Sequence, residues 1–264
     1  MGKNKYFTKS YKKNIFIIFI ISVVFSVLIV FLELNSNFKD SLAVFYTSLS
    51  GLSVTQKNNI IKTSYIINQT RLSPGETFSF NKIVGPRSLE RGYLKDKVIF
   101  EGSEDISIGG GICLVSSSLY NVALLSGMKI IKRVPHYTTV NSVSPGRDAT
   151  VWYGKVDLVF KNILNKPIII KMSIDNNCLK SEIFGKKSNK IFKIKTIILD
   201  IIPFKKRIIY DSNLPKRKKV ILPGKNGYKV RVVRETFIKD KKINSEIISE
   251  DFYHPIPSII KIGE

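Results

Sequence analysis

The stretch SIGGGICLVSSSLYN, residues 107–121, decides the fold expected for this chain of 264 residues. Three glycines let the backbone turn sharply, and a helix is expected behind them because apolar residues recur at helical spacing: Leu114, Val115, Leu119, Val122, Ala123 and Leu125. The turn therefore delivers Cys113 to the first turn of a buried helix. A helix N-terminus favours negative charge, so Cys113 there is a candidate reactive thiol. The alternative is a small buried core residue, since free cysteine is often buried.

The composition is that of a globular and strongly basic protein. Hydrophobic residues make up 44% of the chain and charged residues 24%, which excludes a disordered polypeptide. The 43 Lys and Arg residues against 20 Asp and Glu residues give a formal charge of +23. Such a charge predicts a polyanionic partner, either nucleic acid, an anionic membrane surface or an acidic wall polymer, unless the lysines only form a solvated surface.

The N-terminal sequence predicts a membrane anchor. Five lysines precede residues 15–32, eighteen uncharged residues that are just long enough to cross a bilayer core of about 30 Å. The lysines before this segment and Glu33 after it place the N-terminus in the cytoplasm and the remaining chain outside the cell. A cleaved signal would have a shorter apolar region and a small-residue cleavage site, so an uncleaved single-pass anchor in the cell membrane is favoured.

Export changes the expected partners. A domain outside the cell does not meet nucleic acid, so the expected partner is the cell wall, as peptidoglycan or anionic wall polymer, with the membrane contacted through residues 15–32.

The expected fold class is α+β, with a single N-terminal transmembrane helix followed by a β-rich exported domain around one buried helix after the Gly-Gly-Gly-x-Cys turn. A second, amphipathic helix is expected over residues 58–68, and strands over 77–80, 97–101, 128–134, 148–152, 156–160, 167–174, 179–184, 191–202, 227–238, 243–249 and 256–262. The expected domains are a basic cytoplasmic tail (1–14), the anchor (15–32), a linker (33–56), a main domain (57–188) and a β-rich extension (189–264).

Histidine and cysteine are scarce, with Cys113, Cys178, His136 and His254 as the full set. Their spacing does not resemble that of zinc ligands, so no metal site and no cofactor is predicted. A disulfide between the two cysteines is compatible with export and would remove the thiol. The glycine turn also lacks the later glycine, lysine and hydroxyl residue of a phosphate-binding loop.

One catalytic constellation is left, formed by Cys113, His136 and a carboxylate, which is Asp148 or, as the weaker candidate, Asp157. A cysteine nucleophile needs a base that accepts its proton and a third group that orients the base. Cysteine at a helix start, then histidine and aspartate further along, is also the chain order of transglutaminase-like thiol enzymes. The alternative is that His136 and Asp148 are turn residues, beside Pro135 and after Gly146.

Successive motifs of the chain resemble the VanW family. They are PGETFSFN at 74–81, RGY at 91–93, GGGIC at 109–113, SSSLYN at 116–121, His136, GRDATV at 146–151 and DLVFKN at 157–162, together covering residues 55–185. The chain departs from the family pattern at Leu114, where the family usually has glutamine, and at Tyr137, where it has serine. The tail over residues 231–263 resembles the β-rich ending that often follows this domain.

This resemblance implies a cell-envelope protein of Gram-positive bacteria, in a family named for a protein of vancomycin-resistance gene clusters. Two hypotheses follow. In the first, Cys113 attacks a carbonyl of a peptidoglycan or other envelope peptide, His136 transfers the proton, and Asp148 orients the imidazole. In the second, the domain has no catalytic activity, Cys113 packs in the core, and the basic surface docks on an anionic wall polymer or membrane surface.

Overall fold

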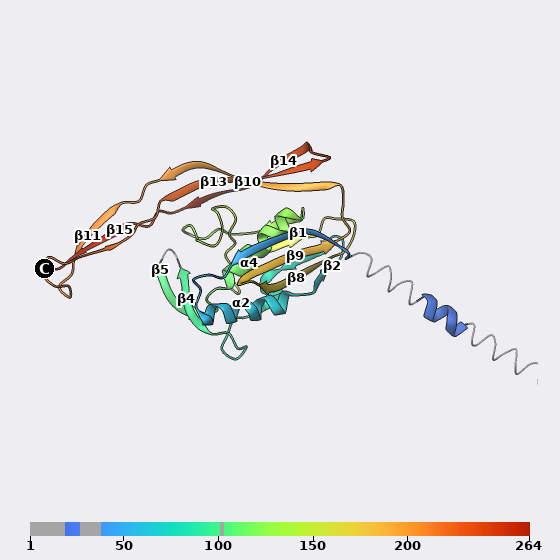
Figure 1. The fold of residues 1–264 in the computed structure, drawn as a ribbon, viewed down its shortest axis with the longest axis horizontal. Coiled ribbons are helices and arrows are strands. Elements are labelled where there is room, and N and C mark those ends of the chain that lie inside the picture. The colour runs from blue at the N-terminus through green and yellow to red at the C-terminus, as the bar shows by residue number, and fades with distance from the viewer. Residues whose placement is uncertain (1–18, 27–37, 101–102) are drawn as a thin grey trace, which may run out of the picture.

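The computed structural model describes residues 19–26, 38–100 and 103–264. The last two of these ranges form two units rich in β-strands (Figure 1). The first unit contains β1 (Asp40–Ser48), α2 (Val54–Ile67), β2 (Thr70–Leu72), β3 (Thr77–Ser79), α3 (Phe80–Val84), β4 (Lys95–Phe100), β5 (Ser103–Ile108), α4 (Ile112–Leu125), β6 (Lys129–Lys132), β7 (Val159–Lys161), β8 (Ile168–Asp175) and β9 (Cys178–Gly185). The second contains β10 (Lys190–Ile202), β11 (Lys206–Tyr210), β12 (Lys219–Leu222), β13 (Gly227–Ile238), β14 (Lys241–Tyr253) and β15 (Ser258–Ile262).

The first unit is built on an antiparallel sheet with the strand order β1-β9-β8-β2. Strand β9 alternates buried and half-buried residues along its whole length, as a strand with one face on the core must. A smaller sheet has the order β3-β7-β6, and β4 pairs with β5 as a hairpin. Phe78 and Phe160, paired across β3 and β7, stack with their ring centroids 4.6 Å apart in the core.

Helix α4 is the centre of this unit. It contacts α2, β1, β9 and β6, and also β10 of the second unit. Every residue of the helix is buried except Cys113 and Leu125, because a helix that is apolar or weakly polar on all sides is covered on all sides. Cys113 is thus half-buried in a helix that is otherwise almost completely enclosed.

The glycine turn fixes where α4 begins. Gly109 and Gly111 have φ angles of 91° and 92°, a backbone conformation that side-chain-bearing residues rarely adopt. The buried Asn59 of α2 holds the turn in place, because its amide donates to Gly110 O (3.1 Å) and Leu94 O (3.0 Å) and accepts from Leu94 N (2.9 Å). Helix α2 therefore sets the position of the first turn of α4.

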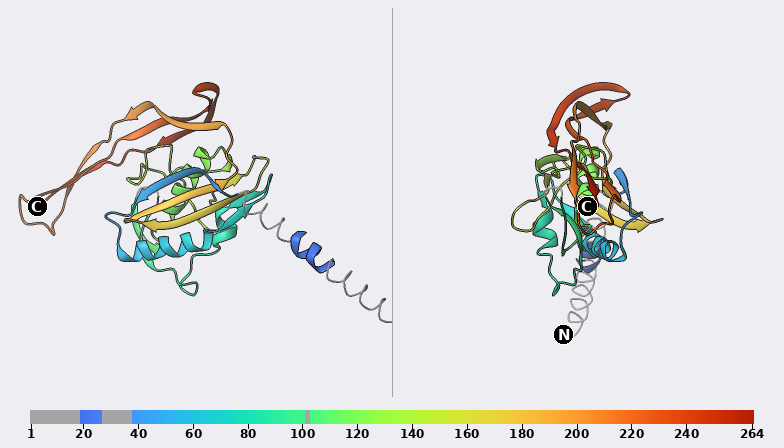
Figure 2. Two further views of the ribbon diagram at one scale, coloured as in Figure 1. Left: turned by 45° about the vertical axis from the view of Figure 1, so that its right-hand side comes forward. Right: turned by 90° about the vertical axis from the view of Figure 1, so that its left-hand side faces the viewer.

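The second unit is a long β ribbon that crosses the first unit and extends beyond it, with the C-terminus at its far end (Figures 1 and 2). Strands β10, β13 and β14 form an antiparallel sheet in that order. Further out, β11 runs parallel to β15, and β12 pairs with the other side of β15. Arg234 of β13 is buried and donates to Met128 O (2.7 Å) and Leu124 O (3.4 Å) at the end of α4, which fastens the ribbon to the first unit.

Local periodicity predicted many elements correctly. The helix expected over residues 58–68 overlaps α2, and the strand expected over 191–202 lies within β10. The strands expected over 227–238 and 243–249 are in β13 and β14, which pair with each other. Two expectations were wrong. The segment taken as a linker contains β1, the edge strand of the main sheet, and residues 148–152 form no strand but only an isolated bridge between Trp152 and Val156.

The predicted fold class and location need correction. Among the described residues, no helix is both long and apolar enough to cross a membrane. The predicted span over residues 15–32 is helical over the described residues 19–26, and the predicted cytoplasmic tail and the rest of the span lie outside the described residues. The single transmembrane helix, and with it the single-pass protein in the cell membrane with an extracellular domain, is therefore not supported. The expectation of one buried helix is also too simple, because α2 and α3 contribute buried residues to the β-rich unit.

Candidate active site

Cys113 lies in the first turn of α4. Gly111 in the left-handed conformation precedes the helix, Ile112 N donates to Gly109 O (3.2 Å), and Leu114 N donates to Gly111 O (3.0 Å). The N–H of Cys113 itself has no acceptor in the part of the chain that the structure describes. The thiol donates to Val151 O, with 3.7 Å between sulfur and oxygen. A half-buried thiol and an open N–H therefore stand together at a helix start.

Polar side chains of α4 hold the segment that carries Asp148. Ser116 Oγ donates to Ala149 O (2.6 Å), and Ser117 Oγ accepts from Ala149 N (2.9 Å). One turn further along, the Asn121 amide donates to Arg147 O (2.7 Å). These side chains bind backbone groups, and they fix the backbone on both sides of Asp148.

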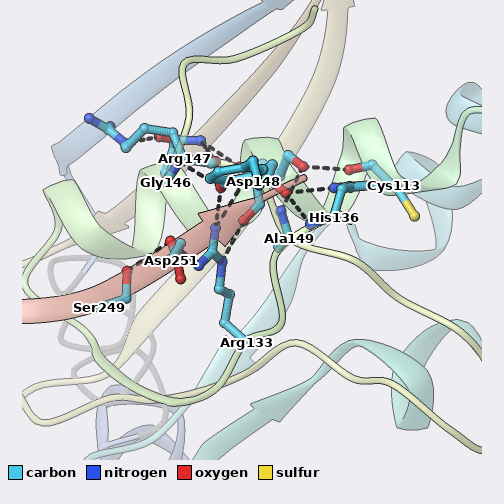
Figure 3. A network of polar contacts seen from close by, with 12 residues as sticks. Cys113, Arg133, His136, Gly146, Arg147, Asp148, Ala149, Ser249 and Asp251 are labelled. Atoms are coloured by element: carbon cyan, nitrogen blue, oxygen red, sulfur yellow. Dashed lines mark hydrogen bonds and ion pairs between the residues drawn. The ribbon is translucent and has the colours of Figure 1, made fainter. Parts of the chain in front are cut away.

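Asp148 is the hub of a buried polar network (Figure 3). Its Oδ2 accepts from the backbone N–H of His136 (2.7 Å) and lies 2.6 Å from His136 Nδ1. Its Oδ1 accepts from Arg133 Nη2 (3.1 Å) and from the hydroxyl of Tyr253. The Asp148 side chain is 1% exposed and the His136 side chain 10%, so the carboxylate is enclosed while the imidazole reaches toward the surface.

The pKa values of Cys113, His136 and Asp148 depend on one another. Burial lowers the pKa of His136, but its hydrogen bonds and charge interactions with Asp148 and Cys113 outweigh this and raise the pKa to about 10. Burial raises the pKa of the Cys113 thiol, but hydrogen bonding and the positive charge at His136, the Val151 carbonyl and Arg87 together hold it below its usual value. Burial likewise raises the pKa of Asp148, and its contacts with His136, Arg133 and Tyr253 bring it below the usual value. The arrangement favours a thiolate beside a protonated imidazole.

Arg133 connects this network to the second unit. It follows β6, donates through Nε to Asp148 O (2.6 Å), and its Nη1 lies 2.5 Å from Asp251 Oδ2 of β14. Both side chains of this ion pair are at least 95% buried, with 3% and 5% exposed. The guanidinium also lies over the Tyr120 ring of α4, 5.1 Å from its centroid. One arginine thus bridges two carboxylates from different units.

Comparison with known proteins assigns both units. Residues 55–184 match the family described as VanW like protein. The chain therefore carries a VanW-like domain over these residues. Residues 195–264 match the G5 domain family. The pairing of a VanW-like unit with a G5 unit supports an envelope-associated protein.

Two curated relatives align with about half of the chain. The uncharacterized protein YoaR of Bacillus subtilis (strain 168) is 38% identical over 130 residues, which are 49% of this chain and 43% of that protein. The vancomycin B-type resistance protein VanW of Enterococcus faecalis (strain ATCC 700802 / V583) is 28% identical over 142 residues, 52% of each chain. This chain therefore spans about half the length of the relatives it matches.

Two solved G5 structures are similar to the ribbon in sequence. The G5 domain of an IgA1 protease is 26% identical over 28% of this chain and 89% of that domain, with a TM-score of 0.22. The structure HP0197-G5 is 28% identical over 29% of this chain and all of that domain, with a TM-score of 0.17.

The two departures of the VanW-like unit from its family pattern have structural explanations. Leu114 points into the core and is 9% exposed, so this side chain contributes packing. Tyr137 stacks on His254 of the G5 unit with ring centroids 4.0 Å apart, and its carbonyl accepts from His254 N (2.8 Å). The residue after His136 therefore contacts the second unit.

The other sequence candidates lie apart from this network. Asp157 accepts from Ser79 Oγ (2.6 Å) and Asn81 N (2.9 Å), so it caps the start of α3 and does not reach His136. Cys178 and Cys113 are both free, so the disulfide considered from the sequence is absent. Within the described residues, no group of three or more His, Cys, Asp and Glu side chains could hold a metal ion.

Sequence reasoning missed Arg87, which lies between the Phe80 and Tyr153 rings at 5.4 and 5.9 Å. Its Nη1 donates to Asn81 Oδ1 (2.7 Å), while Nη2 is buried with no hydrogen-bond partner among the described residues. Its charge acts on the Cys113 thiol. No motif or spacing links Arg87 to Cys113, because their proximity comes from the packing of the turn after α3 against the glycine turn.

Proposed function

We propose that this protein is a thiol-dependent acyl-transfer enzyme that acts on peptidoglycan stem peptides or another envelope peptide. The observation that carries the proposal is that His136 interacts with both Asp148 and Cys113. The buried Asp148 carboxylate lies 2.6 Å from the imidazole, and the pKa of the Cys113 thiol is lowered. A nucleophile, a base and an orienting group in contact form the pattern of covalent catalysis.

The first half of the reaction forms a thioester. The Cys113 thiolate attacks the carbonyl carbon of an amide, and the carbonyl electrons move to the oxygen, which the open N–H of Cys113 is placed to stabilise. When the tetrahedral intermediate collapses, the C–N bond breaks and the leaving amine takes the proton from His136. A pKa of about 10 keeps His136 protonated at neutral pH, so it enters this step as an acid.

The second half transfers the acyl group. An amine or water approaches the thioester, neutral His136 removes its proton, and the new bond to the carbonyl carbon forms. The C–S bond then breaks, which regenerates the thiolate beside a protonated imidazole. Asp148 keeps Nδ1 of His136 engaged throughout, so that Nε2 is the nitrogen available to exchange protons.

Alkylation of Cys113 across a pH series tests the proposal directly. In a Cys178→Ser background the only thiol is Cys113, and we expect its reaction with iodoacetamide to level off at a lower pH than in the same chain unfolded in denaturant. His136→Gln should move this profile to higher pH, because only Arg87 and the Val151 carbonyl then oppose the effect of burial on the thiol. An unshifted profile in the folded chain would contradict an activated nucleophile.

The substrate class is tested by mass spectrometry. Incubation with purified stem peptides should give a thioester adduct on the full chain, and Cys113→Ala should give none. If Cys113 has a shifted profile but no envelope peptide yields an adduct, the thiol is activated for another acyl donor and the proposed substrate class is wrong.

A second candidate function is docking on an anionic wall polymer, which the far end of the G5 unit favours. Residues 216–219, Lys-Arg-Lys-Lys, are all exposed, at the end of the segment between β11 and β12 and at the first residue of β12. Retention of the protein on purified walls should fall as salt is raised, because exposed charges are screened. Charge reversal of Lys216 and Lys218 should weaken retention, and retention that is absent or independent of salt would exclude this role.

A further inference from the structure

We propose that strand β14 of the G5 unit is a component of the candidate active site, with Tyr253 and Asp251 as positioning residues that set the orientation of Asp148 and, through it, of His136. This inference rests on the proposed function. It gives the G5 unit a role in the chemistry of the VanW-like unit that is separate from any contact with the wall.

Tyr253 determines which oxygen of Asp148 faces His136. The Tyr253 side chain is fully buried, and its hydroxyl accepts from Gly146 N (2.6 Å) and donates to Asp148 Oδ1. A phenol hydroxyl has one proton, so with Gly146 as the donor to its oxygen that proton is committed to Asp148. Since Oδ1 is occupied by Tyr253 and Arg133, Oδ2 is left to the two donors of His136.

The Tyr253 hydroxyl keeps this role over a wide pH range. Burial and the neighbouring Asp148 carboxylate raise the pKa of Tyr253 well above its usual value, despite the opposing charge of Arg133. The phenol therefore stays protonated and remains a donor wherever the Cys113–His136 pair titrates.

Asp251 holds Arg133, the other hydrogen-bond donor to Asp148 Oδ1. Its Oδ2 lies 2.5 Å from Arg133 Nη1 and accepts from Ser249 Oγ (3.1 Å). A buried guanidinium between two carboxylates has its direction set by both, and removal of one leaves it free to turn toward the other. Without Asp251, Arg133 is free to turn further toward Asp148 and no longer keeps its place beside Oδ1.

The end of β14 also supports the backbone of His136. His254 N donates to Tyr137 O, the two rings stack, and Phe252 meets the His254 ring edge-on with centroids 4.8 Å apart. Contacts from β14 thus reach Asp148, Arg133 and the residue after His136. A strand that served only as a tether would not need buried polar contacts to both Asp148 and Arg133.

Nitrogen-15 labelling of histidine in the full chain gives a readout that does not depend on activity. The chain has only two histidines, so the His136 imidazole can be identified by comparison with His254→Gln. In the unsubstituted chain we expect a strongly downfield Nδ1–H proton and a raised His136 titration midpoint. Tyr253→Phe keeps the ring and removes the hydroxyl, and it should lower the His136 midpoint and shift the alkylation profile of Cys113 upward.

Two further variants separate positioning from stability. Asp251→Asn should change the His136 signal in the same direction as Tyr253→Phe, and it serves if the first variant fails to fold. Glu250→Gln is the matched control, because Glu250 precedes Asp251 on β14 and its side chain makes an exposed ion pair with Arg231. Glu250→Gln should leave the His136 titration midpoint and the alkylation profile of Cys113 unchanged.

The outcomes distinguish this inference from the proposed function. If adduct formation occurs, Tyr253→Phe should slow it by about tenfold or more, the loss expected for one hydrogen bond to a charged group. If the His136 titration and the Cys113 profile of Tyr253→Phe superimpose on those of the unsubstituted chain while thermal stability falls, Tyr253 has only a structural role and the inference is wrong. If Cys113 of the unsubstituted chain titrates as an ordinary thiol, the proposed function and this inference fail together.

Discussion

Single residues decide how closely strand β4 approaches the glycine turn. Gly110 carries no unusual φ angle, yet a Cβ there would lie 2.7 Å from the carbonyl oxygen of Lys97 and 2.8 Å from Asp96 Cβ. Backbone and a short side chain cannot move aside as the end of a flexible chain can. The glycine at this position is therefore required by space, while its two neighbours are required by backbone conformation.

Gly110→Ala should destabilise the protein by about 1–3 kcal/mol, the cost of forcing atoms into a filled site. It should also slow the alkylation of Cys113 by iodoacetamide, because the glycine turn that leads into α4 must shift. Denaturant unfolding followed by circular dichroism measures the first effect. Gly154→Asn is the control, since Gly154 has nothing within 4 Å and Asn tolerates its positive φ. Equal stability of both variants would show that the space around Gly110 adapts freely.

At the scale of elements, α4 both fills the core and binds the loop between β6 and β7. Its apolar residues pack in the core, and Ser116 and Ser117 form hydrogen bonds with the backbone of the loop at Ala149. Long loops inside compact domains are uncommon and are often functional, and this one carries both His136 and Asp148. The loop has a defined path because the side chains of α4 satisfy its buried backbone groups.

Ser117→Ala should lower the free energy of unfolding by about 1–3 kcal/mol, because it leaves the buried N–H of Ala149 without its acceptor. The loop should also become more mobile, which hydrogen exchange at residues 147–149 would detect. Ser64→Ala is a matched control on α2: its hydroxyl is buried and has no hydrogen-bond partner among the described residues, so its removal should be neutral or slightly stabilising. A larger loss for Ser64→Ala than for Ser117→Ala would contradict this account.

At the scale of the whole molecule, the two units share buried polar contacts rather than a flexible linker. Arg133 with Asp251 and Tyr253 with Asp148 join them near the site, and Arg234 joins them at the other end of α4. Breaking one side of such a contact leaves buried polar groups unpaired, so the units should unfold together.

Arg234→Met should weaken this coupling, because Met128 O loses the donor Arg234, while Leu124 O keeps Gly127 N as a donor. We expect unfolding to separate into two transitions. Fluorescence of Trp152, the only tryptophan, would follow the VanW-like unit, while circular dichroism would follow the strands of both units. Arg231→Met, which removes an exposed ion pair on the same strand, should unfold like the unsubstituted chain. A single coincident transition in Arg234→Met would show that the other contacts alone keep the units coupled.

Local pattern made much of the fold predictable. Helical spacing after three glycines located α4 and placed Cys113 in its first turn, and alternation located the long strands β10 and β13. These features depend on neighbours a few residues apart, which the sequence presents directly. Strand β1 was missed because its pattern is irregular and its pairing with β9 joins residues far apart in the chain.

The sequence by itself determined the helix, the turn and a short set of candidate residues, because histidine and cysteine are so scarce that few combinations exist. Only the tertiary structure shows which of the two carboxylates lies beside His136. The loop folds back so that Asp148 contacts His136, while Asp157 contacts Ser79. The tertiary structure alone brought in Tyr253, 105 positions from Asp148, and Asp251, 118 positions from Arg133. Contacts at such separations depend on strand register and on the packing of two units, and no local spacing encodes either.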